Sequence, residues 1–250
     1  IMKKHILFAL FLSLATSICY SQVKINVQGG AGINGITKEE VYKANFGYRF
    51  GVGVEIPLVR TWSLQTGLQF LNRKSTADES VFGYTLYEGE EVALYQKVKS
   101  TINAVYLQLP VKIATCLPIG KNCGLQISAG PYIAYGIGGN TDADVWQEAN
   151  RNSSDLVTPG KDLAAHMEFK FDTFDKNGGL KRLDIGLSVG ADFKYKSFFV
   201  GCGVEYGLLP IDKEFPKNML KATLNGDQTM VAPHNFGVEF HVGYCFSLGK

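Results

Sequence analysis

The residue types used in hydrolysis and acyl transfer gather in one stretch of the chain. His166 follows Ser153, Ser154 and Asp162, so a base, two hydroxyls and a carboxylate are all present. Nucleophilic catalysis needs a nucleophile beside a base that a third group orients, and nothing in this spacing fixes such a set. Polar loop residues are usually only solvated, so we expect no catalytic residue and no enzyme activity.

The same stretch is rich in acidic residues, with eight acids against four bases between positions 142 and 176. Within it, Asp175-Lys176-Asn177-Gly178 resembles part of a calcium-binding loop. The third acidic ligand and the closing glutamate at the required distance are missing. We therefore expect no metal site and no cofactor, and interpret these acids as a solvated surface.

Four cysteines remain if Cys19 is removed with a leader peptide: Cys116, Cys123, Cys202 and Cys245. An even number in an exported protein suggests disulfides, and the first two flank one short turn. Within each pair, however, one residue is even-numbered and the other odd, so ideal strands would place the two on opposite faces. This parity favours free thiols over disulfides.

Eight segments alternate apolar and polar residues with the period of a β-strand. Each has roughly the 9 to 11 residues that a tilted strand needs to cross a bilayer. The segments are Val23–Ile33, Tyr48–Ile56, Trp62–Phe70, Val105–Ile113, Leu125–Ile137, Leu183–Tyr195, Phe198–Leu208 and Phe236–Leu248.

The connections between these segments alternate between short and long. The short ones are 58–61, 117–122 and 196–197, and the long ones are 34–45, 72–101, 138–181 and 210–234. Short turns on one side and long loops on the other are typical of outer-membrane barrels. We expect short periplasmic turns, long extracellular loops and both termini on the periplasmic side.

The polarity of the two strand faces indicates which one points outward. One face is almost continuously apolar, with aromatic residues such as Trp62 and Tyr135 near the strand ends, as in the interfacial girdles of membrane barrels. The other face carries most of the strand glycines, which suit a crowded interior. These features predict an all-β fold, an eight-stranded antiparallel transmembrane β-barrel. A soluble lipocalin-like carrier, with its apolar face inside, is the alternative.

The inward face of the predicted barrel carries five residues of each charge and one histidine. They are Lys24, Arg49, Lys112, Arg182, Lys194, Glu55, Asp184, Asp192, Glu205, Glu239 and His241. Paired charges can close the interior, because each partner offsets the desolvation cost of the other. Eight strands leave little more space than side chains fill, so we expect ion pairs rather than a diffusion pore. A narrow polar conduit is the other interpretation.

The N-terminus has the pattern of a secretory signal peptide. Lys3 and Lys4 precede an apolar run at 6–15, which is too short to span a membrane as a helix, and small residues follow. We predict a signal peptide over 1–21 and one barrel domain over 22–250. The whole sequence has 25 Lys+Arg against 23 Asp+Glu, so no nucleic-acid partner is expected.

Four motifs give the chain a family resemblance. They are Tyr20-Ser21-Gln22 at the end of the signal peptide, Gln28-Gly29-Gly30-Ala31-Gly32, Tyr106-Leu107-Gln108-Leu109-Pro110-Val111-Lys112 and Val242-Gly243-Tyr244-Cys245-Phe246. On these, the chain resembles the small outer-membrane β-barrel proteins of the Bacteroidetes that are described as PorT-like. The resemblance implies residence in the lipid bilayer of the outer membrane. It implies location more than function, since one member of the family is tied to type IX secretion and many have no known role.

The longest loop carries apolar residues that a merely solvated loop does not need. Those singled out as a partner-binding loop are Trp146, Met167, Phe169, Phe171 and Phe174. Alternation from Met167 to Phe174 also suggests a strand that extends above the membrane. We expect a non-enzymatic accessory subunit of a larger outer-membrane complex, for secretion, barrel insertion or nutrient import. A lipid-modifying enzyme that uses loop residues, and the soluble carrier, are the alternatives.

Overall fold

The computed structural model describes residues 23–37, 42–87, 90–150, 163–175, 179–211 and 232–247. Its elements are strands, namely β1 (Lys24–Thr37), β2 (Tyr42–Val59), β3 (Trp62–Tyr87), β4 (Glu90–Pro118), β5 (Cys123–Asn150), β6 (Leu163–Asp172), β7 (Leu183–Tyr195), β8 (Phe198–Gly207) and β9 (His234–Ser247). Within these ranges, no helix is long and apolar enough to cross a membrane. The predicted signal peptide lies outside the described residues.

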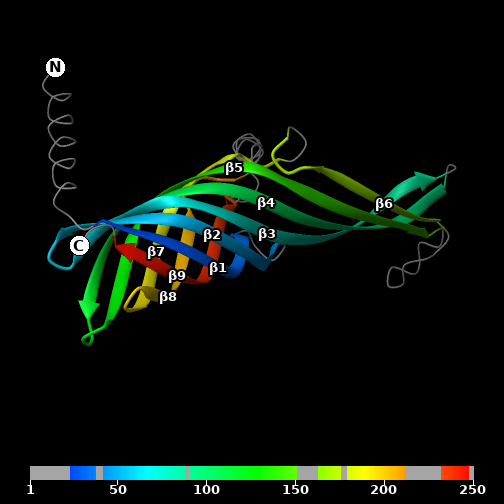
Figure 1. Cartoon of the computed structure of the whole chain (residues 1–250). Coiled ribbons are helices and arrows are strands. Elements are labelled where there is room, and N and C mark those ends of the chain that lie inside the picture. The colour runs from blue at the N-terminus through cyan, green and yellow to red at the C-terminus, as the bar shows by residue number, and fades with distance from the viewer. Residues whose placement is uncertain are drawn as a thin grey trace, which may run out of the picture.

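Eight of the strands form a closed antiparallel ring (Figure 1). Its order is β1, β2, β3, β4, β5, β7, β8 and β9, and the first and last strands pair from Lys24↔Ser247 to Thr37↔His234. Each of the eight segments that alternate in sequence becomes one strand of this ring. The predicted eight-stranded antiparallel barrel is therefore confirmed.

The three predicted short turns are confirmed as well. Arg60 and Thr61 join β2 to β3, residues 119–122 join β4 to β5, and Lys196 and Ser197 join β7 to β8. Arg60 and Lys196 have positive φ angles of 52° and 54°, the left-handed conformation that tight turns use.

Two of the four predicted long loops are wrong. Residues 72–101 continue β3 and β4 as a hairpin that stays in register to Tyr87↔Glu90. Within 138–181, β5 runs on to Asn150 and pairs with β6 from Asn140↔Asp172 to Ala149↔Leu163. We call the resulting four-stranded sheet the arm: residues 75–87, 90–102 and 141–150 together with β6. Figure 1 shows it projecting beyond one end of the ring. Of the other two predicted long loops, the one at 34–45 is shorter than predicted, because β1 extends to Thr37 and β2 begins at Tyr42. Most of the loop predicted at 210–234 lies outside the described residues.

The arm exists because β5 changes partners along its length. Its first part pairs with β7 as far as Tyr135↔Leu183, and its last part pairs with β6. An irregularity in the β4–β5 register separates the two parts, where Val105 faces Gly138 and Tyr106 faces Gly136. A bulge of this kind re-aims a strand.

The wall of the barrel is apolar outside and polar inside. Outward side chains that are about half exposed include Val52, Ile133, Leu187, Val189 and Val200. Buried inward side chains include Glu55, Gln108, Gln126, Asp184 and Glu205. A lipocalin-like carrier needs the opposite arrangement, so the soluble-carrier alternative is wrong.

A charge introduced on the outer wall of the barrel should therefore lower the free energy of unfolding more than a charge introduced on the outward side of the arm. We expect Val189→Arg, in the middle of β7, to lower the free energy of unfolding by about 2–4 kcal/mol, because lipid cannot solvate the guanidinium. Thr101→Arg, on the outward side of the arm, should change it by about 0.5 kcal/mol or less. Urea titration of both variants in phospholipid vesicles measures the difference. Equal losses would contradict a lipid-facing wall.

Candidate functional site

Two arginines hold the middle of the barrel interior. Arg49 of β2 pairs with Glu205 of β8, 2.8 Å from Nη2 to Oε2, and with Glu239 of β9. Arg73 of β3 pairs with Asp184 of β7, 2.5 Å from Nη1 to Oδ2, and with Glu205, 3.3 Å from Nη2 to Oε2. These five buried side chains, the central ion cluster, join five strands of the ring.

Neutral side chains donate further hydrogen bonds to two carboxylates of the cluster, Glu205 and Asp184. Gln108 donates from Nε2 to Oε1 of Glu205 at 2.8 Å. Asp184 accepts from the Tyr132 hydroxyl at 3.1 Å and from Asn235 Nδ2 at 3.0 Å. Buried charges are tolerated when they are both paired and hydrogen-bonded, so this arrangement stabilises the closed barrel.

A second polar layer lies nearer the short turns. Lys194 Nζ donates to Glu55 Oε2 at 2.7 Å, and His241 Nε2 lies 2.7 Å from Asp192 Oδ1. A small polar cavity between these pairs is also lined by Lys112.

Above the central ion cluster, apolar side chains close the other end of the interior. The buried members are Leu71, Ala104, Tyr106, Tyr132, Ala134, Phe174, Leu180 and Ile211. Phe174 packs edge-to-face on Tyr106, with ring centroids 5.4 Å apart. The described side chains thus fill the interior in three layers, which favours the structural interpretation of the interior charges over a conduit.

In the arm, the two faces of the sheet exchange polarity. The inward face of the barrel continues into cross-strand rows that are largely apolar, such as Val98↔Val145↔Met167 and Ser100↔Ala143↔Phe169. Phe169 is 50% exposed and Met167 38% exposed. We call this side of the arm its inner face; it presents apolar surface where the barrel interior presents charge.

The outer face of the arm, which continues the apolar wall, is charged. Its described residues include Asp78, Lys97, Lys99, Asp142, Asp144, Trp146, His166, Glu168 and Lys170. The Lys43 ammonium donates a hydrogen bond of 3.0 Å to Asp78 and thereby lowers the pKa of that carboxyl group.

A row of asparagines marks the boundary between the apolar wall and the charged outer face. Asn72 donates to Asn103 at 2.5 Å, and Asn103 donates to Asn140 at 3.3 Å. The row crosses β3, β4 and β5 at the level where the arm begins. Below it the outward side chains suit lipid, and above it they suit water.

A comparison with protein-family profiles identifies the family of the chain. The family profile described as "Outer membrane protein beta-barrel domain" matches residues 12–213. The chain belongs to this family. It is an integral outer-membrane β-barrel protein.

Among solved structures, this outer-membrane barrel is similar to Ail, the attachment invasion locus protein of Yersinia pestis. The two sequences are 10% identical, the match covers 90% of this chain and 99% of that chain, and the TM-score is 0.30. The N-terminal barrel domain of Pseudomonas aeruginosa OprF gives the same four values. The translocator domain of NalP from Neisseria meningitidis gives 11%, 97%, 95% and 0.27. Comparison with curated proteins finds no match.

Three predicted interior residues of the outer-membrane barrel lie outside the ion-pair network. Arg182 donates to the Gly136 carbonyl at 3.0 Å and lies over the Phe174 ring, so its predicted ion pair is wrong within the described residues. Lys24 is opposite Glu55 in the register but forms no ion pair with a described carboxylate, and neither does Lys112. Neither lysine lies within ion-pair distance of a described carboxylate, although the Lys24 charge acts on Glu55 and the Lys112 charge acts on Glu205.

The partner-binding loop predicted from the sequence is divided by the fold. Trp146 lies on the outer face of the arm, whereas Met167, Phe169 and Phe171 lie on its inner face. Phe174 does not belong with them, because the chain turns after β6 and buries its ring over Gly136. At that position a Cβ atom would lie 2.3 Å from the Phe174 ring.

Arg73 is the functional residue that the loop interpretation missed. The predicted long loop 72–101 includes Arg73, yet its side chain is buried in the central ion cluster. The sequence contains the pattern that predicts this position. Polar side chains at odd-numbered positions of β3, namely Ser63, Gln65 and Gln69, point inward, and Arg73 continues the same alternation.

Three other groups of potentially reactive residues have defined places in the chain. Gly186–Gly190 reads G-L-S-V-G, the letters of a nucleophile elbow, but it lies within strand β7 and Ser188 is buried, so the strand-to-helix turn is lacking. The cysteines Cys116, Cys123, Cys202 and Cys245 are free thiols. Of the proposed catalytic set, His166 alone lies within the described residues.

Replacing Arg73 should distinguish a cluster residue from a loop residue. We expect Arg73→Met to lower the free energy of unfolding by about 3–5 kcal/mol, because Asp184 and Glu205 lose a buried partner. Arg60→Met, in an exposed turn, is the matched control and should have almost no effect. Urea titration measures both, and a second change, Asp184→Asn, should recover part of the loss. An Arg73→Met variant as stable as the parent would contradict the role of the cluster.

Proposed function

We propose that this outer-membrane barrel is a non-enzymatic interaction subunit of a larger outer-membrane assembly, and that the arm carries the binding surface. The observation that supports the proposal is the exposed apolar surface on the inner face of the arm, where Phe169 and Met167 are 50% and 38% exposed. Exposed apolar surface of this kind marks interaction sites.

The edge of the arm supports the same proposal. Among the described residues, β6 is the last strand of the sheet, and it pairs with β5 alone. An extended segment of a partner protein could add to such an edge through main-chain hydrogen bonds and cover Met167 and Phe169 with its own side chains. The proposed partner is therefore a protein with an apolar extended segment.

The orientation in the membrane belongs to the same proposal. The short turns lie at one end of the ring and the arm at the other (Figure 1). Outer-membrane barrels keep their short turns in the periplasm, so the arm would be extracellular and the ends of β1 and β9 near the short turns periplasmic. The assembly would serve secretion, barrel insertion or nutrient import, and a PorT-like role belongs to the first of these.

Charged substitutions on the inner face of the arm test the proposal. Extraction of the parent protein from its native outer membrane in mild detergent should yield a complex larger than one barrel on native sizing, with the partner identified by mass spectrometry. Met167→Glu combined with Phe169→Glu should reduce co-extraction at least tenfold, because the carboxylates would be buried against apolar surface. Ser80→Glu, on the outer face opposite Lys97, is the control and should retain the partner.

Folding of the variants is checked by the migration of heated and unheated samples on gels. A parent protein that is extracted as a single barrel would contradict the subunit role. A folded double variant that keeps its partner would contradict the arm as the binding surface.

A further inference from the structure

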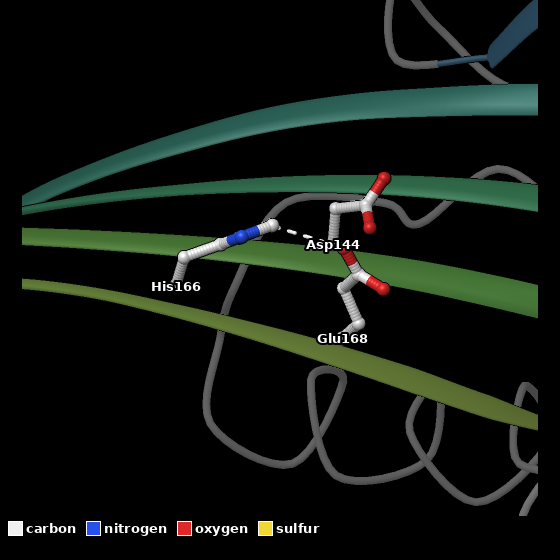
Figure 2. Close-up of side chains that lie close together, drawn as sticks. All are labelled: Asp144, His166 and Glu168. Atoms are coloured by element: carbon white, nitrogen blue, oxygen red, sulfur yellow. Dashed lines mark ion pairs between the residues drawn. The ribbon is translucent and has the colours of Figure 1, made fainter.

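We propose that Asp144, His166 and Glu168 form a binding site for a divalent transition-metal ion on the outer face of the arm. One ligand atom from each side chain can be chosen so that all three lie within 4.8 Å of one another. Figure 2 shows the three side chains close together on the adjacent strands β5 and β6, with a dashed line between His166 and Glu168. This site goes beyond the proposed function, which depends on the opposite face.

The register of the two strands creates the site. Asp144 lies directly opposite Glu168, and His166 is two residues before Glu168, on the same face of β6. Two neighbouring strands therefore supply three ligands. The spacing of these residues in the sequence does not indicate the site, and the sequence alone predicts no metal site.

The arrangement of charges around Asp144 and Glu168 favours the binding of a cation. Two carboxylates directly opposite each other on paired strands destabilise a sheet. Among the described residues, the nearby Lys170 instead pairs with Asp142 at 3.5 Å, and Lys99, although opposite Asp144, forms no ion pair with it. Within the described part of the chain, the ion-pair contact of these two carboxylates joins Glu168 Oε1 to His166 Nε2 at 4.0 Å, and it carries opposite charges only when the imidazole is protonated. A bound divalent cation would turn the repulsion into attraction.

The imidazole of the proposed site is held in place by stacking. The rings of Trp146 and His166 lie 5.0 Å apart with an interplanar angle of 6°. Stacking leaves the nitrogen atoms at the ring edge available to a metal ion. It also places one of the two tryptophans of the chain beside the site, where its fluorescence reports occupancy.

The ligand set selects the class of metal. One imidazole nitrogen and two carboxylate oxygens suit zinc and its first-row neighbours, whereas calcium and magnesium prefer oxygen ligands throughout. With His166 45% exposed and Glu168 77% exposed, three protein ligands leave positions for water. The site is thus an open, surface metal site.

Nickel titration of the full chain tests the proposal. The protein, in detergent and without a histidine tag, carries Trp62→Phe so that Trp146 is the single tryptophan. NiCl₂ should quench its fluorescence saturably, EDTA should reverse the quenching, and ZnCl₂ should compete, whereas CaCl₂ should not. Asp144→Asn and Glu168→Gln should each weaken binding about 10-fold or more.

Asp142→Asn is the matched control, because it removes a carboxylate two residues away on the same strand and face. It should leave the affinity unchanged. The proposal is overturned if Asp144→Asn and Glu168→Gln bind nickel as tightly as the parent, or if Asp142→Asn weakens binding equally. Zinc calorimetry on the chain with both tryptophans repeats the comparison without Trp62→Phe. Partner binding in the co-extraction experiment is read out separately, so either proposal can fail alone.

Discussion

The structure depends on the pairing of two buried arginines with three carboxylates inside a closed ring of strands. Arg49 and Arg73 meet Asp184, Glu205 and Glu239 from five different strands. Any one of these charges alone would be too costly to bury, so the cluster is stable as a set. An apolar wall can face lipid only if the polar inward face is satisfied in this way.

The same constraint explains why the interior is organised in layers. Polar pairs occupy the part near the short turns, the arginines occupy the middle, and aromatic rings close the other end. Such filling leaves the arm and the lipid-facing wall as the surfaces on which an outer-membrane barrel of this kind can act. The proposed binding surfaces therefore lie on the arm, where the polarity of the two sheet faces is exchanged.

Because the polarity is exchanged, the arm has one apolar face and one charged face, both produced by the alternation of side chains along its strands. The row formed by Asn72, Asn103 and Asn140 separates the two regimes. Beyond it, the inner face presents apolar surface and the edge strand β6, the surface proposed here for a partner protein, and the outer face brings opposed carboxylates and a histidine together. The proposed partner-binding surface and the proposed metal-binding site therefore lie on opposite faces of the same sheet.

The sequence by itself determined the eight strands, their inward and outward faces, the short turns and the closed barrel, because alternation and turn residues act over a few neighbouring positions. The tertiary structure alone decided which charges meet, that Arg182 has no ion pair within the described residues, and that β5 exchanges β7 for β6. It also decided that Asp144 faces Glu168. These facts depend on cross-strand register, which ring closure and the irregularity near Gly138 set over long sequence separations.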